Sequence, residues 1–226
     1  MGFYTKHILP RCLDKACSVR PVSKQRAKII PLAKGRVLEI GIGSGLNLPH
    51  YDPSMVERVI GVDPDEHIWA RSQKRREAAA FPIDRIGLSG EDIPMTSESV
   101  DTVVVTYSLC TIPDPIRAFR ELRRILKKDG EILFCEHGRA PDQNIAKWQK
   151  RIDPIWSKLA GGCQSGRDIP RLITEAGLKT LELNQLYIPG PRVLSYNYWG
   201  RARQRVFIGA RIALFATLMG SCRTSV

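Results

Sequence analysis

Short apolar runs alternate with amphipathic stretches along the 226-residue chain. Runs of Val, Ile and Leu without polar alternation indicate strands buried on both faces, as in a parallel sheet. The sequence predicts such strands at 37–40, 58–63, 100–109, 131–136 and 177–188, with 193–200 as the antiparallel partner of the last. Strands that alternate with helices indicate βαβ units. We therefore predict an α/β fold with a doubly wound, mostly parallel sheet and an antiparallel last strand.

Helices are expected between these strands. Residues 65–80, which follow Pro64, contain neither Gly nor Pro. They are rich in Ala, Arg and Glu, and this composition favours a helix. Asp114 and Pro115 supply an N-cap and a first-turn proline, and apolar residues follow at helical spacing as far as Gly130. Further helices are expected at 145–159, at 168–176 and within 1–34.

Charge and cysteine content change this picture mainly at the two ends of the chain. Residues 1–36 carry nine Lys or Arg and one acid, and 192–226 carry six Arg and no acid, while 37–191 is slightly acidic. A basic excess at the ends suits an anionic membrane surface or a polyanion, or serves solubility alone. The six cysteines form no CxxC pair and no metal-ligand ladder. This pattern predicts reduced thiols in a cytoplasmic protein without a metal site.

The C-terminal stretch does not fit the α/β pattern. Residues 206–220 are apolar apart from Arg211 and Thr217. The run is shorter than the ~20 residues of a transmembrane helix, and an arginine near its middle is costly in hydrocarbon. Three interpretations of the tail, 204–226, stay open: a segment bound to a membrane surface or a partner, a helix packed on the domain, or a true span.

Three glycines follow the first strand at every second position: Gly41, Gly43 and Gly45. The dinucleotide fingerprint GxGxxG has its third glycine where Leu46 stands, and a P-loop needs Gly-Lys-Ser/Thr. Closely spaced glycines still let a ligand approach the backbone. Glu39, just before the loop, repels phosphate but suits a ligand that carries an ammonium and a sulfonium. The loop is therefore expected to bind a ligand with little or no phosphate.

A second acid ends the second strand. Asp63 lies 18 residues after Gly45. A carboxylate at this place can accept both ribose hydroxyls of a nucleoside, and it disfavours a 2′-phosphate. The alternative is that Asp63 only caps the following helix.

These residues resemble a family. The segments VLEIGIGSG, VIGVDP, SGEDIP, VDTVVVTYSLCTIPDP and RRILKKDGEILFCEH occur in order over residues 35–136, and they are similar to the motifs of the class I S-adenosylmethionine-dependent methyltransferases. The resemblance implies S-adenosylmethionine as the cofactor and a seven-stranded Rossmann-like sheet. It implies three parts: lid helices in 1–34, a methyltransferase domain in 35–203 and the tail, 204–226.

The resemblance also assigns cofactor contacts. The methionine part would contact the first strand and the glycine loop, the ribose would bind the second strand's acid, and the adenine would lie against the loop that follows the third strand. Ser89 departs from the Asp or Asn that many relatives have there. The residues so assigned are Glu39, Gly41, Gly43, Ser44, Gly45, Asp63, Pro64, Ser89, Gly90, Glu91 and Thr106.

The second half carries a narrower resemblance. The segments FCEH (134–137), DPIW (153–156), GGC (161–163) and NYWG (197–200) are similar to a small-molecule branch that includes the microsomal alkyl-thiol methyltransferases and their bacterial relatives. The branch implies a small, lipophilic acceptor, such as a thiol, a quinol or a lipid head group.

Two residues at the end of the fifth strand are candidate catalytic groups. His137 stands where substrate loops begin in such sheets, and its ordinary pKa of about 6.5 would let it take a proton from the acceptor. A structural histidine is the alternative. Glu136 could orient His137 or hold a loop amide. Cys110 and Cys163 either line the same pocket or are spectators.

The sequence thus predicts methyl transfer from S-adenosylmethionine to a small lipophilic acceptor, by a cytoplasmic chain that is soluble or peripheral to a membrane through 204–226. One alternative, a nucleic-acid methyltransferase, rests on the net charge of +12. Ser108 to Thr111 stand where amino methyltransferases carry Asn/Asp-Pro-Pro-aromatic, which disfavours nucleic acid as a partner. The other alternative is a noncatalytic, cofactor-binding, membrane-associated partner protein.

Overall fold

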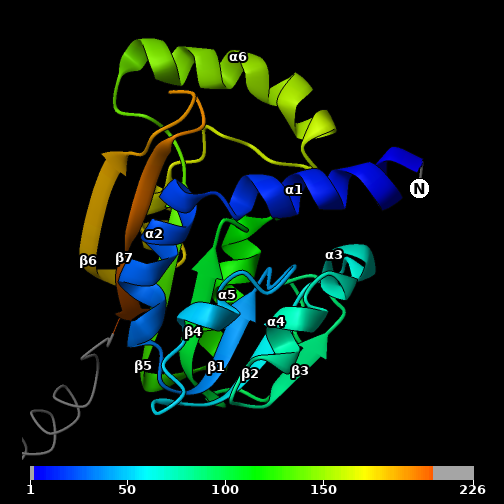
Figure 1. Cartoon of the computed structure of the whole chain (residues 1–226). Coiled ribbons are helices and arrows are strands. Elements are labelled where there is room, and N and C mark those ends of the chain that lie inside the picture. The colour runs from blue at the N-terminus through cyan, green and yellow to red at the C-terminus, as the bar shows by residue number, and fades with distance from the viewer. Residues whose placement is uncertain (1–2, 206–226) are drawn as a thin grey trace, which may run out of the picture.

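A single seven-stranded sheet forms the centre of the computed structural model, which describes residues 3–205 (Figure 1). The strand order is β3-β2-β1-β4-β5-β7-β6, and β7 runs antiparallel to both of its neighbours. This order confirms the predicted doubly wound sheet with an antiparallel last strand. The strands are β1 (Gly35–Ile40), β2 (Val56–Val62), β3 (Ile83–Ile86), β4 (Val100–Thr106), β5 (Leu126–His137), β6 (Leu178–Tyr187) and β7 (Tyr196–Gln204).

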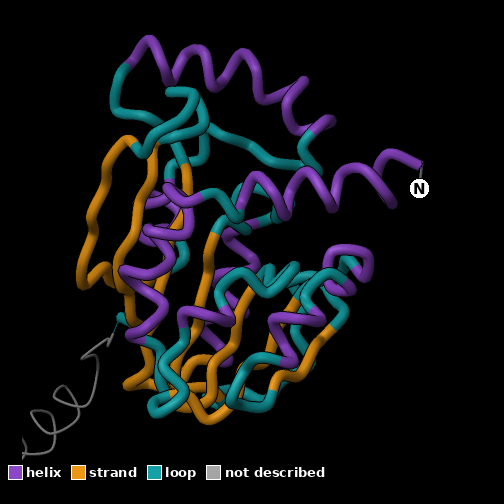
Figure 2. Tube along the Cα trace, viewed as in Figure 1, coloured by secondary structure: helices purple, strands orange, loops and turns teal. Residues whose placement is uncertain are grey.

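Helices pack against the sheet, and two of them lie above the carboxyl ends of its parallel strands. In Figure 1, α1 and α6 lie across the top, above the carboxyl ends of the parallel strands, and Figure 2 shows the strands as one orange layer beneath them. The α-helices are α1 (Leu9–Cys17), α2 (Arg20–Ile29), α3 (Glu66–Ala70), α4 (Gln73–Glu77), α5 (Pro115–Ile125), α6 (Gln143–Leu159) and α7 (Ile169–Glu175). Short turns of helix are η1 (Tyr4–Ile8), η2 (Ile30–Leu32) and η3 (Leu48–His50).

The core lies on both faces of the sheet. Val103 and Val105 of β4 belong to the cluster that includes the apolar face of α5, whereas Val104 belongs to a second cluster with Ile29 and Ile30. All three valines are fully buried. This two-sided burial explains why β4 reads as an unbroken apolar run, as the sequence pattern predicted.

Several elements differ from the prediction. The helix expected over 65–80 is divided into α3 and α4, because the buried Ser72 hydroxyl donates to the Trp69 carbonyl oxygen at the break (2.7 Å). The strand expected over 100–109 ends at Thr106, since Tyr107 has a φ of 52°. The short β3, with its half-exposed side chains, gave too weak an apolar signal to be predicted.

The helix expected to run toward Gly130 ends earlier. Leu126 leaves α5 and starts β5, where it pairs with Val100. Gly130 does not end a helix: a Cβ at this position would lie 2.5 Å from the Leu126 Cδ1 and 2.8 Å from the Asp101 carbonyl oxygen. Close packing inside β5 therefore accounts for this glycine.

No helix within residues 3–205 is long and apolar enough to cross a membrane. The apolar run 206–220 that motivated the three tail interpretations lies outside the described residues. Of the predicted tail, 204–226, the structure describes only residues 204 and 205, and Gln204 is the last residue of β7.

A glycine in β7 generates a test of the fold. At Gly200 a Cβ would overlap the carbonyl oxygen of Glu182, beside the register shift of β6. We expect Gly200→Ala to lower the free energy of unfolding by about 3 kcal/mol, the upper end of overpacking costs, because backbone must move to relieve the overlap. Urea unfolding measures this loss. Gly87→Ala is the matched control, since the nearest atoms there belong to a flexible arginine side chain 3.6 Å away; equal effects of both substitutions would contradict the prediction.

Candidate active site

The predicted site residues gather at the carboxyl edge of the sheet. Glu39 lies in the last part of β1, Asp63 follows β2, Thr106 ends β4 and His137 ends β5. These four strands are neighbours in the order β2-β1-β4-β5. The strand order reverses between β1 and β4, which is where ligands bind in open α/β sheets.

The glycine loop after β1 requires its glycines. Gly41, Gly43 and Gly45 have φ values of 68°, 51° and 73°, a region that side chains with a Cβ rarely adopt. A Cβ at residue 41 would also lie 2.5 Å from the Ser108 Cβ. Backbone conformation, and at Gly41 close packing against Ser108, therefore require these glycines, and ligand binding by the loop stays a prediction.

Asp63 is oriented by two backbone amides. Its Oδ2 accepts from Gly43 N (2.9 Å) and its Oδ1 from Asp65 N (2.8 Å). Burial raises the pKa of Asp63, against the effect of these two hydrogen bonds. A carboxylate offers about four acceptor positions, so two stay available to a ribose diol. The alternative that Asp63 only caps the next helix is wrong, because the Asp65 side chain accepts from His67 N and Ile68 N instead.

Glu39 belongs to a buried hydrogen-bond network. Its Oε1 accepts from Asn47 Nδ2 (2.9 Å) and its Oε2 from the Tyr51 hydroxyl (2.6 Å), and the residue is 1% exposed. Burial raises the pKa of Glu39 to about 7, although both hydrogen bonds act in the other direction. Glu39 thus holds Asn47, and through it the loop, in place.

Arg26 is a site residue that the sequence reasoning missed. It lies on α2, 5% exposed, and its Nη1 donates to Thr106 Oγ1 (2.6 Å) and to Asn47 Oδ1 (2.8 Å). Its guanidinium stacks over the Tyr107 ring, 4.8 Å from the centroid. Its Nε is buried without a partner, so one donor is free to meet an anionic group. The sequence signal that could have identified Arg26 is its helical spacing from the apolar Ile29 and Ile30, which places it on the buried face of the helix.

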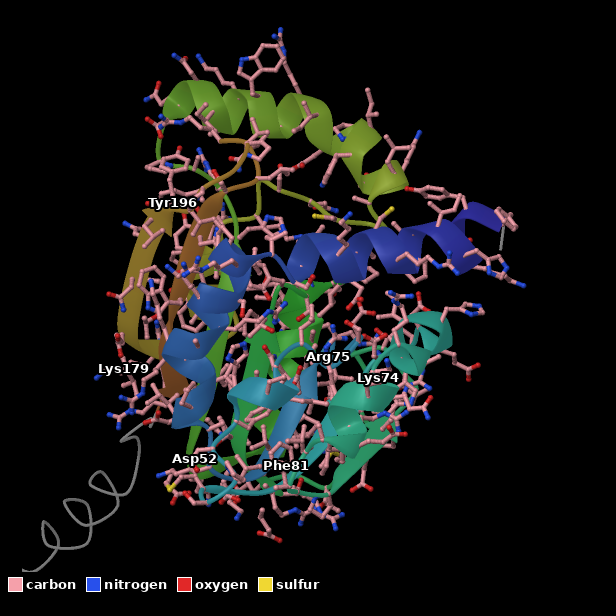
Figure 3. The ribbon with its side chains drawn as sticks, in the orientation of Figure 1. Asp52, Lys74, Arg75, Phe81, Lys179 and Tyr196 are labelled. Atoms are coloured by element: carbon pink, nitrogen blue, oxygen red, sulfur yellow. The ribbon has the colours of Figure 1, made fainter. Side chains whose placement is uncertain are left out.

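The N-terminal helix is fastened to the glycine loop. Asp14 on α1 accepts from Ser44 Oγ (2.6 Å) and pairs with Arg71 (3.2 Å) and Arg75 (3.3 Å). Arg75 also donates to the Ser44 carbonyl oxygen (2.8 Å). Figure 3 labels Arg75 beneath α1, whereas Asp52 and Phe81 lie at the opposite edge of the sheet. Ser44 therefore contacts α1 through its side chain.

The residues predicted to face adenine form a chain of contacts. Ser89 Oγ donates to Glu91 Oε2 (2.8 Å), and Glu91 Oε1 accepts from Asp114 N (2.7 Å). Gly90 packs against Ile40, which a Cβ would approach to 3.3 Å. Pro64 is exposed beside Asp63. Glu91 thus links this loop to the start of α5.

Glu136 holds the loop that follows β4. Its Oε1 accepts from Ser108 N (2.8 Å) and Leu109 N (3.1 Å), so the loop-amide alternative describes the hydrogen bonds that it makes. Burial raises the pKa of Glu136 to about 7. Its Oε2 is buried without a partner.

His137 lies among sulfur atoms. Its Nε2 is 3.5 Å from the Cys163 Sγ, its ring stacks on Tyr107 with centroids 6.4 Å apart, and its Nδ1 is buried without a partner. Burial alone would lower the pKa of His137, but the Cys163 thiol raises it above its ordinary value. A hydrogen bond from Cys110, and then one from His137, lowers the pKa of Cys163. The ligand atoms of Cys110, His137 and Cys163 all lie within 4.8 Å of one another.

The buried Glu39 generates a prediction about pH. Because its pKa is higher in the folded chain than its unfolded value of about 4.3, its contribution to stability is fully present at low pH and is lost as the pH rises through about 7. We expect the stability of the wild type relative to Glu39→Gln to fall by about 3 kcal/mol between pH ~5 and pH ~8. Urea unfolding at several pH values measures the difference. A pH-independent difference between the two proteins would contradict it.

Comparisons with known proteins identify the family. Residues 38–134 match the family model described as methyltransferase domain. Human thiol S-methyltransferase TMT1B is 30% identical over 68% of this chain and 64% of its own length. Phosphatidylethanolamine N-methyltransferase of Cereibacter sphaeroides is 28% identical over 66% of this chain and 72% of its own length. The match therefore spans less than two thirds of the human relative.

Solved structures agree on the fold. The YcgJ protein of Bacillus subtilis is similar with a TM-score of 0.60 and 16% identity, over 88% of this chain and 99% of its own. An S-adenosylmethionine-dependent methyltransferase from Thermotoga maritima is similar with a TM-score of 0.62 and 21% identity, over the same shares. The order of motifs, the order of strands and the family match together place this chain among the class I S-adenosylmethionine-dependent methyltransferases.

Proposed function

We propose that this chain methylates a small lipophilic acceptor, and that the acceptor atom is a thiol sulfur. The observation that supports it is the sulfur-lined His137 at the end of β5, beside the switch point of the sheet. Relatives named thiol S-methyltransferase, phosphatidylethanolamine N-methyltransferase and demethylmenaquinone methyltransferase support a small acceptor. Among these acceptors, a thiol best suits a site in which a histidine contacts thiols.

The residues at the switch point suit the cofactor. Bound S-adenosylmethionine supplies an activated sulfonium methyl group. Asp63 has acceptor positions for ribose hydroxyls, and the unpartnered Nε of Arg26 suits the carboxylate of a methionine moiety. Gly41 and Gly43, which have positive φ values, carry no Cβ atom, and this lets a ligand approach the backbone closely. The contacts of Ser89, Gly90 and Glu91 with adenine belong to the same proposal.

The residues on the acceptor side would have a different function, which is to activate the acceptor. A thiol becomes a good nucleophile only as the thiolate, so a methyltransferase for thiols must favour loss of the acceptor proton. We place His137 in this role, and we assign Glu136 the positioning of Ser108 and Leu109, whose loop carries Cys110. In this proposal Glu136 is a positioning residue and makes no contact with the acceptor.

Cofactor affinity tests the role of Asp63. We expect Asp63→Ala to weaken binding of S-adenosylmethionine and of its demethylated product at least tenfold, because hydrogen bonds to a charged group contribute ~1.5–3 kcal/mol each. Isothermal titration calorimetry measures both affinities. The control is Asp84→Ala, which removes an exposed side chain of β3 that pairs with Arg58. This substitution should leave both affinities unchanged. Equal affinities of Asp63→Ala and the wild type would refute the ribose contact.

A labelled-methyl screen tests the acceptor. We expect transfer to alkyl thiols, and little to matched alcohols, quinols, phosphatidylethanolamine or RNA. His137→Gln should lower kcat for the thiol at least ~100-fold, the low end for a lost proton-transfer group, while calorimetry still finds cofactor binding. Transfer to quinol or lipid without thiol methylation would contradict the acceptor. Cofactor binding without any transfer would favour the noncatalytic alternative.

A further inference from the structure

Three soft-metal ligands meet on the acceptor side from three separate segments. Cys110 lies in the loop after β4, His137 ends β5 and Cys163 follows α6. Their ligand atoms lie within 4.8 Å of one another, and the Nε2 of His137 is 3.5 Å from the Cys163 Sγ. In a tetrahedral zinc site with Zn–S of about 2.3 Å and Zn–N of about 2.0 Å, a sulfur and a nitrogen ligand are about 3.5 Å apart. The separation of the His137 and Cys163 ligand atoms is therefore that of two ligands on one metal ion, and Cys110 lies close enough to be the third.

In the described part of the chain, no hydrogen bond to a main-chain group occupies the ring nitrogens of His137, so the imidazole is available to a metal. A histidine kept for packing commonly spends its ring nitrogens on main-chain groups. Here Nδ1 has no partner, and Nε2 faces a thiol, which is a weak hydrogen-bonding group. The ring is held instead by stacking on Tyr107.

The two cysteine loops are held together by the protein. Gln164 N donates to the Cys110 carbonyl oxygen (2.9 Å), so the residue after Cys163 is bonded directly to the other ligand's backbone. Arg167 Nη1 donates to the Leu109 carbonyl oxygen (2.5 Å). Such support fixes ligand positions before a metal arrives.

A carboxylate organises the loop that carries Cys163. Asp153 on α6 accepts from Ser165 N (2.8 Å), Ser165 Oγ (2.7 Å) and Gly166 N (3.1 Å). Gly162, with a φ of 91°, allows the loop to pass the Thr111 carbonyl oxygen, which a Cβ would approach to 3.4 Å. The segments DPIW and GGC, which cofactor binding does not use, therefore serve to place one sulfur atom.

Among the described residues, the cluster offers three protein ligands and no fourth. Within residues 3–205, no other His, Cys, Asp or Glu places a ligand atom in the same group. Cys110 is buried, while His137 and Cys163 are only partly buried. Three protein ligands with one free position are typical of catalytic rather than structural zinc sites.

We propose that Cys110, His137 and Cys163 bind one thiophilic metal ion, Zn²⁺ in the first place, and that its fourth coordination position accepts a thiolate ligand. The second part rests on the proposed function. On binding, the acceptor thiol gives its proton to solvent and its sulfur bonds to the metal. In methyl transfer the S–CH₃ bond of the sulfonium breaks, a new S–CH₃ bond forms on the acceptor, and the neutral thioether leaves the metal. In the metal-bound form His137 is a ligand and does not itself take the acceptor proton. The metal then replaces the imidazole in favouring the thiolate, and loss of His137 would act through loss of the metal.

Metal binding by the full-length protein tests the first part without any methyl transfer. The protein is reduced, stripped with a chelator and titrated with Zn²⁺ against a chromophoric competitor. We expect one Zn²⁺ per chain, with affinity falling more than ~100-fold in Cys163→Ser, Cys110→Ser and His137→Gln, since even residues behind the ligands are worth 10–100-fold. Cys12→Ser, which removes an exposed thiol of α1, should bind as the wild type. Circular dichroism confirms folding of each variant.

Three results would overturn the metal site: no stoichiometric uptake by the reduced wild type, uptake that survives all three substitutions, or unchanged uptake in Cys110→Ser. The last would reduce the cluster to a His137–Cys163 pair. If the single substitutions prevent folding, Co²⁺ in the wild type decides: thiolate-to-cobalt charge-transfer bands support the site, and their absence overturns it.

The open position has its own readout. Adding a small alkyl thiol to the Co²⁺ protein should shift the thiolate-to-cobalt absorption, and the matched alcohol should not. An unchanged spectrum with thiol would overturn the open position while leaving the metal site intact. Because neither measurement uses S-adenosylmethionine, failure of the proposed methyl transfer and failure of the metal site are distinguished.

Discussion

The candidate site depends on one buried cation. Arg26 donates to Thr106 at the end of β4 and to Asn47 in the segment after β1, and Asn47 donates in turn to Glu39. A buried guanidinium is stable only when its charge and donors find partners, and a buried carboxylate has the same requirement. The network meets most of both requirements: of its buried side-chain atoms in the described structure, only the Arg26 Nε lacks a partner, and Arg26 lowers the pKa of Glu39 against the larger effect of burial. It fixes α2, β1 and β4 relative to one another at the place where we propose that the cofactor binds.

A second set of charges, at the rim, closes the site in a weaker way. Asp14 joins α1 to Ser44 and to two arginines of the α3–α4 region, and those side chains are 15–36% exposed. Partly exposed ion pairs contribute only about 1 kcal/mol or less each, because water competes for them. The contrast with Arg26 has a consequence for dynamics. The N-terminal segment contains one helix that is locked to the sheet and another whose attachment can open at modest cost, which suits a ligand that must enter and leave beneath α1.

Much of the fold followed from the sequence because the signals were local. The unbroken valines of β4 and the Asp114–Pro115 helix start needed no tertiary information. The failures also have local causes that composition does not carry. The helix over 65–80 breaks because the hydroxyl of the buried Ser72 donates to the carbonyl oxygen of Trp69, and Leu126 leaves α5 because a strand partner competes for it. The residues predicted to bind the cofactor come from motifs within 35–136, whereas Arg26 was not named because it lies before the first motif and contacts Thr106, 80 residues away.

The acceptor side shows why sequence spacing could not indicate the cluster of Cys110, His137 and Cys163. Spacing rules for metal ligands work where ligands share one short loop or one helix turn, so that sequence separation reports distance. Here the three ligand atoms come from the ends of β4, β5 and α6, and their separations of 26 and 27 residues report nothing about proximity. What brings them together is the sheet, since β4 and β5 are adjacent, together with Asp153 and Arg167, which draw the third loop across. A cofactor loop can be read from one stretch of chain, but the chemistry that chooses the acceptor is assembled by topology.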